Sequence, residues 1–218
     1  MISRWHCLVA ASLLLARALG AAELTTRITD THGAAVADAV VTVVPKDAAA
    51  APARQAAAET RIIDQKNETF VPYVEMFRPG DSVVFHNSDQ TRHHVYSFAP
   101  ARQFEFVLTS GQSSPPLRLE HAGVVAVGCN IHDRMINYLY ISDAPWVART
   151  TADGRVTIGG LPPGDFDVRV WHPQLRPGQA DPVKPLHLAD PAEAGELSFS
   201  LPLLPDPRIP ADRERANY

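Results

Sequence analysis

The chain has 218 residues, of which 45% are hydrophobic and 20% are charged. This length predicts one large domain or two small ones, and the composition is that of a globular protein with enough apolar material for a core. The formal net charge of −4 excludes a broadly basic nucleic-acid-binding protein, so we expect no nucleic-acid partner.

Residues 1–22 have the pattern of a secretory signal peptide. A short polar start with Arg4 and His6 precedes an apolar run over residues 8–16, and small residues follow. The apolar run is too short to cross a bilayer, which needs about 20 residues. The alternative, a buried N-terminal helix, lacks an amphipathic pattern. We therefore expect export, removal of residues 1–22 and no membrane span.

The exported part of the chain contains a single cysteine, Cys129, because Cys7 is lost with the signal peptide. A single cysteine cannot form an internal disulfide. In an oxidising compartment an unpaired thiol is a liability unless it is buried or bound. Cys129 is therefore the first candidate functional residue.

Short β-rich runs separated by Gly, Pro, Asp and Asn fill most of the exported chain, which is typical of sandwiches and barrels. Residues 24–28 and 39–44 are candidate strands that a turn could join as a hairpin. They belong to residues 23–45, which we expect to form the first part of a β-sandwich. Residues 46–59 are rich in alanine and are expected to be a mobile linker.

The next block, residues 60–143, contains the densest set of candidate strands. Many short strands over such a length favour a Greek-key sandwich. The candidate strands cover residues 69–77, 82–87, 95–98, 104–108, 117–119, 123–127 and 138–142.

A third block is expected over residues 146–203, with strands at 155–158, 165–171 and 197–203 and turn signals at 152–154 and 161–164. Residues 165–171 alternate strictly between apolar and polar side chains, which indicates a half-buried strand. Residues 204–218 contain several prolines and arginines and are expected to form a disordered tail.

Sulfur and nitrogen donors gather around one expected loop. Cys129, His132 and Met135 stand at positions i, i+3 and i+6 between two candidate strands, and His93 offers a second imidazole at the start of another strand. Cu(I) prefers thiolate and thioether, Cu(II) accepts imidazole, and a His₂Cys set with a distant methionine is the donor set of blue-copper sites. Cys129, His132, Met135 and one of the adjacent histidines, His93 or His94, are therefore predicted to hold one copper ion.

Two stretches resemble a known family. Residues 80–89, followed by His93, are similar to the strand and loop that carry the first copper histidine in plastocyanin-like proteins, and the loop from Cys129 to Met135 resembles the short ligand loop of amicyanins. Across about residues 62–143 the chain resembles the periplasmic cupredoxins labelled methylamine-utilisation proteins. The resemblance implies a cupredoxin fold, a periplasmic location and a redox partner, which could be a cytochrome or a quinoprotein dehydrogenase.

His93 and His94 compete for the upstream ligand position. The resemblance favours His93, because the family's ligand comes first in its strand and asparagine commonly follows it. His94 would then lie outside the ligand set and hydrogen-bond between the two ligand loops. Asn87 is expected to help hold these loops, the alternative being an ordinary turn residue.

The chain departs from the family pattern beside His132. Electron-transfer cupredoxins generally present an apolar patch around the exposed histidine, whereas Asp133 and Arg134 follow it here. These charges predict a more polar, salt-sensitive encounter with a partner. The alternative is that both side chains simply point into water.

The parts on either side of residues 60–143 resemble the two halves of a carboxypeptidase-regulatory-like, transthyretin-like sandwich. We expect the cupredoxin domain to be inserted in this second small β-sandwich, so that residues 24–44 pair with residues 150–171. In the alternative arrangement, both flanks are extra strands appended to the cupredoxin domain.

Electron transfer through the edge of His132 is the leading functional hypothesis, and no enzyme activity is expected because no second metal site or substrate base is evident. Copper storage, delivery or sensing is a second hypothesis, and a structural envelope protein without metal is a third. A cysteine hydrolase would need a group that orients its histidine, which the sequence does not supply. Zinc accepts one cysteine and two histidines, but it would leave Met135 without a role.

Overall fold

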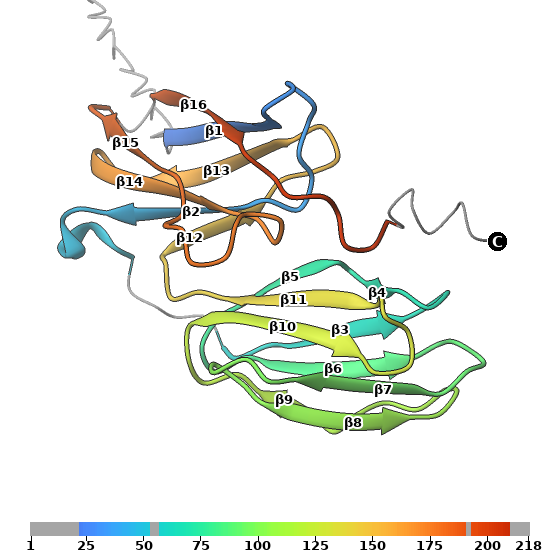
Figure 1. Ribbon diagram of the computed structural model, residues 1–218. Helices are drawn as coiled ribbons and strands as arrows, with labels where there is room; N and C mark the ends of the chain where they lie inside the picture. Colours follow the sequence, from blue (N-terminus) through green and yellow to red (C-terminus); the bar gives the residue numbers. More distant parts are fainter. Residues whose placement is uncertain (1–21, 53–56, 191–192, 210–218) are drawn as a thin grey trace, which may run out of the picture.

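The computed structural model describes residues 22–52, 57–190 and 193–209. Within these ranges, the regular elements are β-strands, apart from one short 3-10 helix, Ala48–Ala50. The strands form two sandwiches, which lie one above the other in Figure 1. The expected all-β class and sandwich architecture are therefore confirmed. The predicted signal peptide, including Cys7, lies outside the described residues except for Ala22.

The central sandwich is built from β3 to β11. One sheet has the strand order β5-β11-β10-β7-β8, and the other has the order β4-β3-β6-β9. The strands are β3 (Thr60–Gln65), β4 (Phe70–Val71), β5 (Val74–Phe77), β6 (Ser82–Asn87), β7 (His93–Ser97), β8 (Phe104–Leu108), β9 (Leu117–Arg118), β10 (Gly123–Cys129) and β11 (Ile136–Ile141). The single strand expected over residues 69–77 is two strands in different sheets, with Pro72, which lacks an N–H group, at the crossing.

The flanking sandwich contains the strands before and after the central one. Its sheets have the orders β13-β1-β16 and β12-β2-β14-β15. The strands are β1 (Ala22–Asp30), β2 (Val40–Pro45), β12 (Trp146–Arg149), β13 (Arg155–Leu161), β14 (Gly164–Trp171), β15 (Val183–Leu188) and β16 (Ala194–Leu201). The predicted hairpin of β1 with β2 is wrong, because the two strands lie in different sheets. The predicted alternation in β14 is confirmed, with Phe166, Val168 and Val170 buried.

Strands far apart in the sequence hold the flanking sandwich together. β1 pairs with β13 in antiparallel fashion, with Leu24 opposite Ile158, and β2 pairs with both β12 and β14. The strands on the two sides of residues 60–143 therefore pair with each other. This pairing supports the proposal that the central sandwich is inserted in the flanking one. The resemblance to a carboxypeptidase-regulatory-like module stays a prediction.

Residues 204–209 were expected in a disordered tail but make defined contacts with both sandwiches. The Leu204 N–H donates to the Gln174 carbonyl at 2.8 Å, and the Arg208 guanidinium lies 3.4 Å from the centre of the Tyr73 ring. Asp206 holds Arg208 in an ion pair at 2.6 Å. This segment therefore ties the end of the flanking sandwich to the start of β5. Residues 210–218 of the expected tail lie outside the described residues.

Each sandwich has its own hydrophobic core. In the central core, Phe85 stacks on Phe104 with ring centres 5.2 Å apart and meets the edge of Phe70 at 6.3 Å. In the flanking core, Phe166 meets Trp146 edge to face at 5.9 Å. The two cores share no residue, and a smaller apolar cluster lies where the sandwiches meet.

His172 is a buried histidine at the end of β14. Its Nε2 donates to the Ala37 carbonyl at 3.2 Å, and its Nδ1 accepts from the Gln174 N–H at 3.2 Å, so the neutral ring is satisfied. Burial lowers the pKa of His172 to about 4; the Ala37 carbonyl and Asp206 oppose this shift, whereas Arg208 adds to it. In the unfolded chain a histidine has a pKa of about 6.5.

The flanking sandwich should therefore lose stability in acid. Above pH ~6.5 His172 is neutral in both states and its contribution is complete. As the pH falls towards about 4, only the unfolded chain takes up a proton, so the free energy of unfolding decreases by up to about 3 kcal/mol. Urea unfolding at stepped pH should show this loss in the wild type and a smaller loss in His172→Gln.

The matched control is His187→Gln, since His187 is exposed and pairs with Asp165 at the surface. Its pH profile should follow the wild type within about 0.5 kcal/mol, as expected for a surface substitution. Parallel profiles for wild type and His172→Gln would show that His172 is not the group responsible.

Candidate metal centre

The sheet topology brings the two ligand segments to one end of the central sandwich. β7 and β10 are antiparallel neighbours, with Val95 opposite Cys129 and Tyr96 opposite Gly128. The start of β7 therefore lies beside the end of β10. His93 opens β7 and Cys129 closes β10, so their side chains meet although 36 positions separate them.

Three of the predicted ligands converge on one point. The Cys129 Sγ lies 3.7 Å from the His93 Nδ1 and 3.9 Å from the His132 Nδ1, and all three donor atoms lie within 4.8 Å of one another. The His93 and His132 ring centres are 5.0 Å apart. His93 is fully buried and Cys129 is 5% exposed, whereas the His132 side chain is 22% exposed.

The loop between β10 and β11 is closed by its own backbone. The Cys129 N–H donates to the Met135 carbonyl at 3.2 Å, and the Met135 N–H donates to the His132 carbonyl at 3.1 Å. Met135 is buried in the same core cluster as Cys129. The loop is therefore tight enough to bring the side chains of Cys129 and His132 together. Met135 is its last residue before β11 begins.

The spacing of the donor atoms fits a bound transition metal. With metal–sulfur and metal–nitrogen bonds of about 2.3 and 2.0 Å, an ion bound at an angle of about 120° separates the two donors by roughly 3.7 Å. The observed sulfur–nitrogen distances of 3.7 and 3.9 Å match this value. Two imidazoles and one thiolate suit copper, and they also suit zinc.

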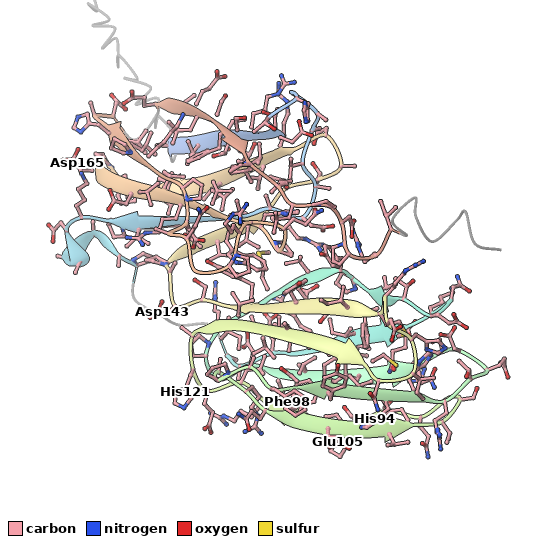
Figure 2. The ribbon with its side chains drawn as sticks, in the orientation of Figure 1. His94, Phe98, Glu105, His121, Asp143 and Asp165 are labelled. Carbon is pink, nitrogen blue, oxygen red and sulfur yellow. The ribbon has the colours of Figure 1, made fainter. Side chains whose placement is uncertain are left out.

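His94 points away from this cluster. Its Nε2 lies 2.7 Å from the Glu105 Oε1 on β8, and Figure 2 labels the two residues close together on the central sandwich. Its Nδ1 lies 3.4 Å from the Asn130 Nδ2, and its carbonyl accepts the Asn130 N–H at 3.0 Å. Residue 94 therefore contacts the β10–β11 loop without entering the donor cluster.

Asn87 ends β6 and is fully buried. Its Nδ2 donates to the carbonyls of Thr91 at 2.8 Å and Leu108 at 3.0 Å, and its Oδ1 accepts the Asp89 N–H at 2.9 Å. These bonds fix the loop that leads into His93. Asn87 thus contacts the loop and not the donor atoms.

Two carboxylates that the sequence did not single out face the histidines. The Asp89 Oδ2 lies 2.9 Å from the His93 Nε2, and the Glu68 Oε1 lies 3.6 Å from the His132 Nε2. Burial raises the pKa of Asp89, but the N–H groups of Glu68, His93 and Asn67 outweigh it, so this pKa lies below its usual value. The four-residue spacing of Asp89 and His93 was the only hint in the sequence.

Comparisons with known proteins give structural matches alone. No protein-family model and no curated protein sequence matches the chain. A copper(I) form of an amicyanin variant is 17% identical over 47% of this chain and 98% of its own, with a TM-score of 0.34. A purple cupredoxin from Nitrosopumilus maritimus is 21% identical over 39% of this chain and 100% of its own, with a TM-score of 0.33.

A copper-containing nitrite reductase from Thermus scotoductus also matches, with 21% identity over 45% of this chain and 25% of its own, and a TM-score of 0.34. At such low identities and TM-scores, these similarities carry no functional argument for this chain. The functional conclusion therefore depends on the donor atoms and their surroundings.

Proposed function

We propose that the chain is a mononuclear copper protein that transfers electrons. The observation that carries this proposal is the convergence of the His93, Cys129 and His132 donor atoms within 4.8 Å. The ligand loop also includes the buried thioether of Met135, which zinc would not use and which Cu(I) accepts. Bound copper would supply one-electron chemistry between its Cu(I) and Cu(II) states.

The burial of the donors supports electron transfer. His93, Cys129 and Met135 are nearly or fully inaccessible to water, so the surroundings of the ion would change little between oxidation states. The partly exposed edge of His132 then offers a route to a partner. We propose a redox protein as this partner, either a cytochrome or a quinoprotein dehydrogenase.

The surface around the donors combines apolar and charged groups. A groove of about 450 Å³ beside Cys129 and Met135 is lined by Tyr96 and Phe98, among other residues, and by the charged Asp133. Phe98 is 77% exposed, and Figure 2 labels its position on the central sandwich. Because apolar and charged side chains occur together here, we expect the binding of a partner protein to depend on both the contact area and the salt concentration.

Copper storage or delivery is the second candidate function. The carboxylate of Glu68 beside the Nε2 of His132 makes the exposed edge more polar than an apolar docking patch would be. A slow electron self-exchange rate would favour this second function. Fast exchange would favour electron transfer.

We further propose that the protein works in the periplasm after export. Within the described ranges, no helix is long and apolar enough to cross a membrane. The proposal of export depends on the signal-peptide pattern of residues 1–22. Fractionation of cells that produce the full chain would test it, and a protein retained with its first residues in the cytoplasm would contradict it.

Copper loading of the purified protein tests the proposed function. One Cu(II) ion per chain should bind and give an intense thiolate-to-copper absorption in the visible range, with a matching electron-paramagnetic-resonance spectrum. A loaded protein without colour would contradict the thiolate–copper assignment, and preferential zinc binding would contradict copper as the metal.

A further inference from the structure

Asp89 lies outside the donor set but contacts it directly. Its side chain is only 12% exposed, and the facing His93 ring is fully buried. The Asp89 Oδ2 lies 2.9 Å from the His93 Nε2, within ordinary hydrogen-bond distance. Because His93 has no contact with water, Asp89 is its polar partner at this nitrogen.

The bond to Asp89 determines which ring nitrogen of His93 carries a proton. An ionised carboxylate only accepts hydrogen bonds, so the Nε2 of His93 must be the N–H. In the neutral ring the Nδ1 then keeps its lone pair, and this atom lies 3.7 Å from the Cys129 Sγ. The tautomer that Asp89 stabilises is therefore the one that can bind a metal beside the thiolate.

The same carboxylate holds the turn between β3 and β4. The Asp89 Oδ1 accepts the Asn67 N–H at 2.5 Å, and its Oδ2 accepts the Glu68 N–H at 2.9 Å. Asn67 and Glu68 both have left-handed φ values, 54° and 53°, which non-glycine residues adopt at a cost. The two bonds to Asp89 offset this cost and fix the turn.

The fixed turn reaches the second histidine. Glu68 projects from it, and its Oε1 lies 3.6 Å from the Nε2 of His132. One aspartate thus orients His93 directly and, through the turn, places a second carboxylate beside His132. Both imidazoles face negative charge on the side away from Cys129.

We propose that Asp89 is the positioning residue of the metal centre: it fixes the metal-binding tautomer of His93 and holds Glu68 beside His132. The inference rests on the proposed copper function. Negative charge behind both imidazoles favours Cu(II) over Cu(I), so Asp89 also lowers the reduction potential of the site.

The test compares Asp89→Asn with wild type and with Asp165→Asn. Asparagine keeps one acceptor oxygen in place of two. Its NH₂ group would face an N–H donor that the Asp89 carboxylate now accepts from, so at least one of these donors would lose its partner. Loss of such a supporting group typically weakens metal binding about 10–100-fold. We expect Cu(II) affinity to fall by this factor and Cu(I) affinity to fall less, and each tenfold difference raises the potential by about 59 mV.

Asp165→Asn removes the same charge from another aspartate–histidine pair, Asp165 with His187, which is exposed on the flanking sandwich, so its Cu(II) affinity should stay within about twofold of wild type. Asp89→Glu, which keeps the charge, should recover part of the affinity. Equal affinities and potentials for Asp89→Asn and Asp165→Asn would overturn the inference while leaving the copper site intact. A wild type that binds no copper would overturn both proposals.

The metal-free protein gives a second readout that does not depend on copper or on the variant's stability. Nitrogen-15 NMR of wild-type His93 should show a slowly exchanging proton on Nε2 that is hydrogen-bonded to the Asp89 carboxylate. A ring protonated at Nδ1 would overturn the inference. If Asp89→Asn folds poorly, this measurement on the wild type still decides the question.

Discussion

Replacing Cys129 by serine should abolish the visible colour of the copper-loaded protein and remove most of its copper affinity. The absorption requires a thiolate bound to Cu(II), and a serine hydroxyl is neither deprotonated at neutral pH nor soft enough for Cu(I). The Sγ of Cys129 lies 3.7 Å from the Nδ1 of His93 and 3.9 Å from the Nδ1 of His132. Its loss therefore removes the donor that both imidazoles face.

The fold should survive this change. A serine Oγ at the same position can donate to one of the two imidazole nitrogens, so the buried hydroxyl would not lack a partner. We expect a loss of about 1–2 kcal/mol in the free energy of unfolding of the metal-free protein, measured in urea.

Val127→Ala is the matched control, because Val127 is the preceding inward-facing residue of β10 and is also buried. It should cost a similar free energy of unfolding yet keep the absorption band. A Cys129→Ser protein that retains an intense band would show that the thiolate is not the source of the colour. A control that also loses the band would point to general damage of the strand.

Local spacing in the sequence was sufficient to predict which side chains of the β10–β11 loop come together. Cys129 and His132 belong to one loop, and the structure places them beside His93, as the resemblance implied. Asp89 and Glu68 were not predicted, because their roles depend on a turn between β3 and β4 that meets the metal centre only in the folded chain. Pattern reading cannot find such a contact.

The strands that were missed or misjudged show the same limit. β15 contains Pro185, which argues against a strand when the sequence is read alone, and β12 is only half-buried throughout. The predicted hairpin of β1 with β2 failed because β1 takes its partners from β13 and β16, far along the chain. Pairing of sequence neighbours is common but not obligatory.

Truncating Phe166 to alanine should destabilise the flanking sandwich and leave the metal centre intact. Phe166 is fully buried in β14 against Trp146, and removing such a ring from a core costs about 3–5 kcal/mol. Its core shares no residue with the core around Cys129. The copper affinity and absorption of the folded variant should therefore equal those of the wild type.

Phe85→Ala is the matched change in the central core, where Phe85 stacks on Phe104 and is equally buried. It should cost a similar free energy but lower the temperature at which the copper colour is lost. Bound copper should stabilise the central sandwich alone, because binding stabilises only the unit that holds the ligand. When Phe166→Ala is heated, the circular-dichroism signal of the β-strands should therefore begin to fall at a lower temperature than the visible absorption of the copper site.

Simultaneous loss of both signals in Phe166→Ala would mean that the two sandwiches unfold as one unit. The two sandwiches contact each other through the apolar cluster around Tyr73 and Val74, in which Trp171 packs against two tyrosines of β11, and through two arginines. Arg149 of β12 donates to the Val74 carbonyl at the start of β5, and Arg208 covers the Tyr73 ring. If the signals coincide in Phe166→Ala and separate once Arg149 is also replaced by alanine, the hydrogen bond from Arg149 to Val74 couples the two sandwiches. Separation in Phe166→Ala itself shows that the central sandwich stays folded when the flanking one has unfolded.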